Sequence, residues 1–108
     1  MKIIEIIEKF SRLGIYEKRE VGDDYIELVF YNTEIAEWNK IFTDILDPAI
    51  KPAGVKPNKD VQNLTEDFGG IYEEQTLYKK EFENTTIIAM FWPWQNDVNT
   101  TLKVIALQ

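Results

Sequence analysis

The side chains that could do chemistry in this chain are carboxylates, lysines, tyrosines and hydroxyls, because the sequence contains no histidine and no cysteine. Histidine is the usual general acid or base near neutral pH, and both residue types are common ligands of zinc and other transition metals. Their absence argues against thiol nucleophiles, zinc sites and iron–sulfur clusters. We therefore expect no metal and no cofactor, and we lean towards a chain that is not an enzyme.

Carboxylates occur in three adjacent pairs, and these are the remaining candidates for binding Ca²⁺ or Mg²⁺. The pairs are Asp23-Asp24, Glu66-Asp67 and Glu73-Glu74. None has the alternate spacing of a calcium-binding loop, and adjacent side chains on a strand point to opposite faces of a sheet. Turns and solvated surface therefore explain these pairs better than a metal site does.

The triplet Trp92-Pro93-Trp94 is the most unusual local pattern. Exposed aromatic rings around a proline can form a binding platform. In the alternative interpretation, both rings close the hydrophobic core at the end of a strand, where proline is tolerated. We favour the core interpretation, and we place Trp94 near a rim because Pro93 has no N–H for further strand pairing.

A Pro-rich arm, residues 48–58, carries Lys51 and Lys56 and contains no acidic residue. Its three prolines favour a defined, extended arm. The lysines are cationic groups that could approach aromatic faces or an anionic partner. No Gly-rich phosphate motif accompanies them, so a solvated loop is the simpler interpretation.

The strongest element that could position these residues is a strand predicted over residues 85–94. Its β-branched and aromatic residues favour a pleated, packed setting. Unlike any other segment, it is apolar at both alternating sets of positions, so we expect a central strand that is buried on both faces. One side of the strand presents Ile87, Ala89 and Phe91, and the other presents Ile88, Met90, Trp92 and Trp94.

Periodicity places the other elements around this strand. Apolar residues at helical spacing predict three helices, over residues 3–13, from Asn32 or Thr33 to about Asp47, and from an Asn58 cap to Phe68. Further strands are predicted over residues 15–21, 25–31, 75–82 and 101–107. The expected fold is a single α+β domain over residues 1–108, in the order α-β-β-α-α-β-β-β. Its sheet of about five strands is mainly antiparallel, with helices chiefly on one face.

The turn after residues 75–82 decides which strand faces match. A two-residue loop places Tyr78 and Phe82 on the Ile87 side of the next strand. A three-residue loop, with Asn84 in the left-handed conformation, places them on the Ile88 side. We favour the three-residue loop because it gathers the largest aromatic side chains on one face.

These expectations locate a candidate binding site. Three helices of this length suffice to cover one sheet face, so we expect the second face to be left for a ligand, a second subunit or the arm. In the alternative interpretation, the arm lies over the aromatic rings and completes the core. The candidate binding residues are Trp94, Trp92, Tyr78, Tyr72, Lys51 and Lys56.

Charge limits the choice of partner. The chain has 108 residues and a formal net charge of −7, which argues against nucleic acid and against an anionic membrane surface. The N-terminus lacks a signal-peptide pattern and cysteine is absent, so we expect a cytoplasmic location.

The function that we favour is a non-catalytic protein-interaction module. It would act by self-association or through an acidic surface offered to a basic partner. One alternative is a binder of a small apolar or aromatic ligand on an aromatic-lined sheet face. Another is an enzyme that uses carboxylate, Lys or Tyr groups.

Overall fold

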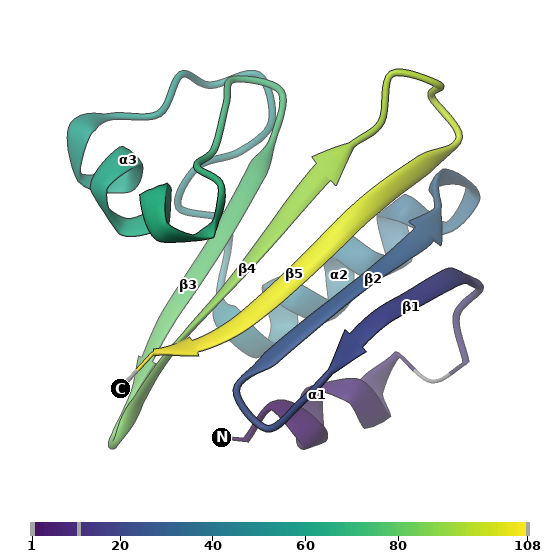
Figure 1. The fold of residues 1–108 in the computed structure, drawn as a ribbon, viewed down its shortest axis with the longest axis horizontal. Coiled ribbons are helices and arrows are strands. Elements are labelled where there is room, and N and C mark those ends of the chain that lie inside the picture. Colours follow the sequence, from purple (N-terminus) through teal and green to yellow (C-terminus); the bar gives the residue numbers. More distant parts are fainter. Residues whose placement is uncertain (1, 11, 108) are drawn as a thin grey trace.

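The structure, a computed structural model, describes residues 2–10 and 12–107. In this part of the chain, three α-helices, five strands and two short 3₁₀ turns follow the predicted order, which confirms the α+β fold (Figure 1). The elements are α1 (Ile3–Lys9), β1 (Ile15–Val21), β2 (Tyr25–Tyr31), η1 (Asn32–Glu34), α2 (Ile35–Leu46), α3 (Lys59–Thr65), η2 (Glu66–Phe68), β3 (Thr76–Phe82), β4 (Thr85–Pro93) and β5 (Asn99–Leu107).

The strands form one sheet in the order β1-β2-β5-β4-β3, and each pair of neighbours is antiparallel. The middle strand is therefore β5, and the prediction that residues 85–94 form the central strand is wrong. The last strand inserts between β2 and β4, so that Leu102 pairs with both Leu28 and Phe91. Strand β4 is nevertheless buried on both faces, because no side chain from Ile87 to Phe91 is more than 2% exposed.

Helices α1 and α2 cover one face of the sheet, called here the first face, which lies behind the sheet in Figure 1. Helix α2 buries Trp38 and Phe42 completely. Trp38 stacks on Phe30 of β2, with ring centroids 4.4 Å apart. This face holds the larger of the two hydrophobic clusters, to which β4 contributes Ile87, Ala89 and Phe91.

Helix α3 and turn η2 pack on the opposite face, called here the second face (Figure 1). The expectation that three helices cover one face is therefore wrong. Val61 and Leu64 of α3 need an apolar surface, and β4 offers Ile88 and Met90 on this side. A strand that is apolar on both sides requires cover on both.

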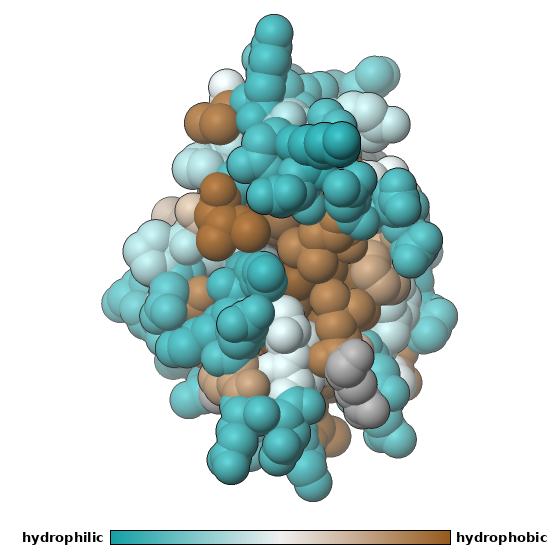
Figure 2. Space-filling view, turned by 90° about the vertical axis from the view of Figure 1, so that its left-hand side faces the viewer, coloured by the Kyte–Doolittle hydropathy of each residue, from teal (hydrophilic) through white to brown (hydrophobic). Residues whose placement is uncertain are grey.

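The second cluster is not fully covered. Figure 2, seen from the side of α3 and β3, shows apolar surface emerging between hydrophilic side chains. The partly buried apolar residues packed against this cluster are Tyr25, Leu64, Phe68, Trp92 and Leu107.

None of the helices within the described residues has the length and hydropathy needed to cross a membrane.

The β3–β4 hairpin has the shorter of the two turns considered. Phe82 pairs with Thr85, which leaves a two-residue loop and places Tyr78 opposite Ala89. The prediction of a three-residue loop is therefore wrong. The shorter loop turns Tyr78 towards α2, where its ring lies 5.9 Å from Phe42 and its hydroxyl donates to Oδ1 of Asn39 at 2.6 Å.

Each of the three predicted helices differs at one end, and α3 gives way after Thr65 to the 3₁₀ turn η2. Helix α1 ends at Lys9 instead of residue 13. Asn32 does not cap α2: a 3₁₀ turn precedes that helix, and Oδ1 of Asn32 accepts a hydrogen bond from the Thr100 hydroxyl at 2.6 Å. The Asn58 cap of α3 is confirmed, because its Oδ1 accepts from the backbone N–H of Val61 at 2.9 Å.

Candidate functional site

The second face has a covered half and an open half. The layer formed by α3 and η2 packs against β3 and β4, whereas none of the described helices lies over β1, β2 and the adjoining part of β5 (Figure 1). We call this uncovered surface the open half. Its exposed or functional side chains, with Trp94 just after β4, are Tyr16, Glu17, Arg19, Tyr25, Glu27, Tyr31, Trp94, Thr101 and Lys103.

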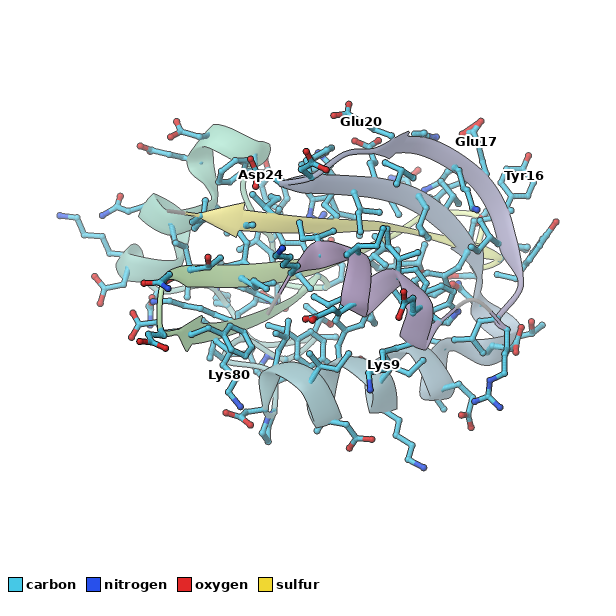
Figure 3. The ribbon with its side chains drawn as sticks, turned by 90° about the horizontal axis from the view of Figure 1, so that it is seen from below. Lys9, Tyr16, Glu17, Glu20, Asp24 and Lys80 are labelled. Carbon is cyan, nitrogen blue, oxygen red and sulfur yellow. The ribbon has the colours of Figure 1, made fainter. Side chains whose placement is uncertain are left out.

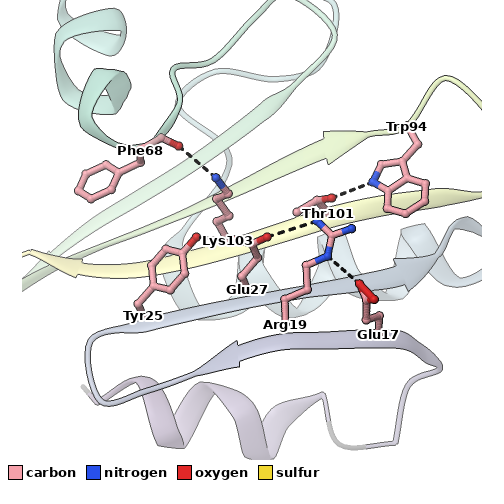
Figure 4. Close-up of polar contacts among 8 residues, drawn as sticks. All are labelled: Glu17, Arg19, Tyr25, Glu27, Phe68, Trp94, Thr101 and Lys103. Atoms are coloured by element: carbon pink, nitrogen blue, oxygen red, sulfur yellow. Dashed lines mark hydrogen bonds and ion pairs between the residues drawn. The ribbon is translucent and has the colours of Figure 1, made fainter.

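An ion network crosses the strands of the open half (Figure 4). Nε of Arg19 lies 2.7 Å from a carboxylate oxygen of Glu17, and its Nη1 lies 3.3 Å from Glu27. The other oxygen of Glu27 accepts a hydrogen bond from the Tyr25 hydroxyl at 2.7 Å. The guanidinium is therefore balanced by two carboxylates, and its position is fixed by charge-assisted hydrogen bonds.

The pKa of Arg19, Tyr25, Glu27 and Lys103 is shifted by burial and by contacts within the network, and the Glu17 hydrogen bond raises that of Arg19. Partial burial acts to raise the pKa of Glu27, but hydrogen bonds from Tyr25 and Arg19, with the charge of Lys103, outweigh it and lower that pKa. Burial, and then the hydrogen bond to Glu27, raises the pKa of Tyr25. Desolvation lowers the pKa of Lys103. Near neutral pH, Glu27 is therefore an ionised acceptor and Tyr25 a neutral donor.

Lys103 joins the open half to the covered half. Its Nζ lies 3.8 Å from the ring centroid of Trp92 and donates to the backbone carbonyl of Phe68 at 3.3 Å. This short approach to an indole face is a cation–π contact. Lys103 therefore anchors the end of the α3 layer, because its ammonium contacts both the Trp92 ring and the Phe68 carbonyl.

Three aromatic side chains and one arginine form a separate group, the aromatic patch: Tyr16, Tyr31, Trp94 and Arg19. Tyr16 meets Tyr31 edge to face at 5.5 Å and Trp94 at 6.2 Å between ring centroids. The Arg19 guanidinium lies 5.7 Å from the Trp94 ring centroid. Tyr16 is 51% exposed and Tyr31 is 39% exposed, so the patch is accessible to another molecule.

The structure separates the predicted site residues. Trp92 and Trp94 lie half-buried on the second face, and the Nε1 of Trp94 donates to the Thr101 hydroxyl at 2.8 Å. Tyr78 lies on the first face, in the larger hydrophobic cluster. Tyr72 is 65% exposed beyond α3, and Lys56 is exposed on the arm. The six predicted residues therefore do not form one site.

Lys51 has a structural position that differs from the expected one. It is 2% exposed, and its ammonium donates to the carbonyls of Pro52, Glu73 and Gln75 at 3.1, 2.6 and 2.5 Å. Desolvation lowers its pKa. An ammonium has three N–H donors, and all of them are used. Lys51 is therefore not the open cationic group that the sequence suggested.

Sequence reasoning missed most of the open half, notably Tyr16, Arg19, Tyr31 and Lys103. Alternation along residues 25–31 places Tyr31 on the face opposite to Phe30. Tyr16 and Arg19 depend on two register shifts in the β1–β2 pair, after Ile15 and after Lys18. A bulge changes which side chains share a face, and no residue type in this segment marks its position.

No cluster of three or more possible metal-ligating side chains occurs within the described part of the chain. Comparison of the chain with protein-family models, with curated proteins and with solved structures found no match. The function is therefore inferred from the surface of the molecule itself.

Proposed function

We propose that this chain is a non-catalytic protein-interaction module and that it binds a partner protein through the aromatic patch. The observation that carries this proposal is the grouping of Tyr16, Tyr31 and Trp94 with Arg19 on the open half of the second face, which none of the described helices covers (Figure 1). Tyr, Trp and Arg are enriched among the residues that dominate binding energy in protein interfaces. Aromatic residues and arginine are also enriched in such interfaces relative to the rest of the protein surface.

The patch is held in place before binding. The indole N–H of Trp94 is fixed by Thr101, and the guanidinium of Arg19 is fixed by Glu17 and Glu27. Ordering a flexible side chain at an interface costs about 0.5–1.5 kcal/mol. Because these two side chains are already ordered, a partner would lose less of its binding free energy to this cost.

Acidic side chains along β1 and at the β1–β2 turn indicate the charge of the partner. Figure 3 shows Glu17, Glu20 and Asp24 with Tyr16 on the side of the sheet away from α1 and α2. Glu20 and Asp24 make no ion pair with any described residue. A partner with basic side chains around its contact surface suits this environment, whereas self-association would bring like charges together.

An enzymatic function would need convergent polar groups and a perturbed carboxylate or lysine in one pocket. Glu27 and Lys103 have shifted pKa values, but neither lines any of the five surface hollows described for the chain. The hollow that gathers the most uncharged polar side chains has no lysine in its lining. The groups with shifted pKa values and the hollow with convergent polar side chains are therefore in different places, which favours binding over catalysis.

The test compares Trp94→Ala with Tyr72→Ala in capture of a partner from the cells that encode the chain. Both substitutions remove an aromatic ring, but Tyr72 is 65% exposed and lies outside the patch. We expect wild type and Tyr72→Ala to retain the same partner and Trp94→Ala to lose it. The affinity for the purified partner should fall at least tenfold, which corresponds to about 1.4 kcal/mol.

Stability measurements separate lost binding from lost folding. Trp94→Ala should cost less than about 2 kcal/mol, mainly through the lost Thr101 hydrogen bond. The completely buried Trp38 gives the comparison, since Trp38→Ala should cost about 3–5 kcal/mol. A folded Trp94→Ala variant with wild-type affinity would exclude the aromatic patch as the interface. Concentration-dependent sedimentation of the isolated chain would instead identify a second copy as the occupant.

A further inference from the structure

A hollow of about 260 Å³ lies at the end of the sheet where β4 finishes and β5 begins. It opens between the start of α2, the arm and the first face, on the opposite side of the sheet from the aromatic patch. Its lining combines apolar and uncharged polar side chains with a single carboxylate. The lining residues are Asn32, Ile35, Asn39, Ala53, Glu74, Thr76, Phe91, Pro93 and Thr100.

The apolar wall of this end hollow is rigid. Phe91 is 2% exposed, and it meets Phe30 and Phe42 edge to face at 5.5 and 5.6 Å between ring centroids. Close-packed aromatic contacts of this kind hold a ring in one orientation. The other four hollows are larger, and the linings of the two largest, of about 550 and 490 Å³, include the exposed side chains of Ile4 and Ile50. The end hollow differs from these two in the firmly packed Phe91 ring that forms part of its wall.

Two groups in the lining can donate further hydrogen bonds. The Thr76 side chain is 9% exposed, and its hydroxyl has no partner among the described residues. Oδ1 of Asn32 accepts from Thr100, but the Asn32 amide N–H₂ has no acceptor within the described part of the chain. Asn39 is already satisfied, because it accepts from Tyr78 and donates to the carbonyl of Ile35. Both side chains line the hollow, and neither group is among the fully buried atoms that lack a partner, so a bound molecule with an acceptor oxygen can reach them.

We propose that the end hollow binds a small, neutral aromatic molecule that carries a carbonyl group. The ring would lie against Phe91 and Ile35, and the carbonyl oxygen would accept a hydrogen bond from the Thr76 hydroxyl, near the Asn32 amide. The volume equals that of about nine water molecules in the liquid, at about 30 Å³ each, so it suits a molecule of about ten non-hydrogen atoms. Glu74 in the lining disfavours an anion. This binding site is independent of the proposed protein interface.

Benzamide is a probe of the right size and chemistry, and its binding can be followed by ¹H–¹⁵N NMR titration of the full chain. We expect saturable shifts of the backbone amides of Thr76 and Thr100 and of the Asn32 side-chain amide, with half-saturation in the millimolar range that is usual for so small a ligand. Benzoate, the matched anion, should bind at least about threefold more weakly because of the Glu74 charge.

Thr76→Val keeps the shape of the side chain and removes the hydroxyl, so it should weaken benzamide binding about three- to tenfold, the effect of one hydrogen bond. The control is Thr86→Val, a half-buried threonine of β4 that is not part of the lining. The proposal is overturned if benzamide gives no saturable shifts at the lining residues, if the shifts lie elsewhere, or if both variants bind like wild type. Equal binding of benzoate would overturn the requirement for a neutral ligand.

Discussion

The indole of Trp92 is the residue at which the two halves of the second face meet. One side of the ring is approached by the Lys103 ammonium at 3.8 Å. The ring also lies against Gly69, where an added Cβ would come within 2.5 Å of the indole. Gly69 has φ +101°, and its neighbour Gly70 has φ +76°. The end of η2 therefore depends on a residue without a side chain, for both space and backbone conformation.

A pair of substitutions separates these two requirements. Gly69→Ala and Gly70→Ala both place alanine at positive φ, which costs about 1–2 kcal/mol. Only Gly69→Ala also forces an atom into the Trp92 ring, and overpacking adds about 1–3 kcal/mol. We expect Gly69→Ala to be clearly the less stable of the two in urea denaturation. Equal losses would mean that the Trp92 ring moves aside freely, and that the α3 layer does not depend on this contact.

At the scale of elements, the arm closes one edge of the sheet. The backbone N–H and C=O of Lys51 both pair with Leu77 of β3, at 3.3 and 2.9 Å. The Lys51 ammonium then ties the arm to the carbonyls of Glu73 and Gln75. An uncovered edge strand offers free N–H and C=O groups to other chains. The arm therefore works as a cover for β3.

Lysine-to-methionine substitutions test this account of the arm. Lys51→Met keeps most of the side-chain volume but removes the ammonium from three part-buried carbonyls, of which those of Pro52 and Glu73 keep a backbone donor, and this should cost about 1–3 kcal/mol. Lys56→Met, on the exposed part of the same arm, should change stability by less than about 0.5 kcal/mol. Chemical denaturation of the two variants provides the measurement. If the two substitutions cost the same, the ammonium of Lys51 does not hold the arm to the sheet.

The opposite edge, β1, is protected in another way. Two register shifts interrupt its pairing with β2, and its middle residues, Glu17 to Glu20, are all charged. Bulges and charged side chains are the usual means by which an edge strand avoids pairing with another chain. Contact through the face of the sheet is therefore favoured over contact through the β1 edge, which agrees with the proposed position of the interface.

The helices and strands were predicted well from the spacing of apolar residues, because this spacing involves only residues that are close in the sequence. The alternation along β4 follows from a spacing of two residues, and the helical stripe of α2 follows from spacings of three and four residues. The Asn58 cap likewise follows from residues that are close in the sequence. The position of β5 depends on pairing between distant segments, for which the sequence carries no local sign. The turn between β3 and β4 is decided by contacts of Tyr78 with α2, again a distant element.

The same limit applies to the candidate site. Trp92 and Trp94 were placed on the second face because they alternate with Phe91, which needs no knowledge of pairing. Tyr16 and Arg19 reach Trp94 only because β1 pairs with β2 through two bulges and β2 pairs with β5. Lys51 was misjudged for a different reason: its burial follows from the bridge to Leu77, which orders an arm that is polar in composition.

For the whole molecule, the central fact is that two hydrophobic clusters share one sheet. Alternate residues of β4 belong to different clusters, as Phe91 does to the first and Met90 to the second. If the sheet unfolds, the apolar side chains of both clusters become exposed together. We therefore expect a single cooperative unfolding transition, as is usual for domains of this size, although the α3 layer is small.

The three tryptophans allow this to be tested, because Trp38 lies in the first cluster while Trp92 and Trp94 lie on the second face. In a Trp92→Phe/Trp94→Phe variant, fluorescence reports on the first face; in Trp38→Phe, it reports on the second. Within each variant, the urea midpoint from fluorescence should match the midpoint from far-UV circular dichroism. An earlier fluorescence midpoint in Trp38→Phe alone would show that the second face opens while the sheet is intact. The α3 layer would then be a separately folding unit, and the aromatic patch would border a segment that can open.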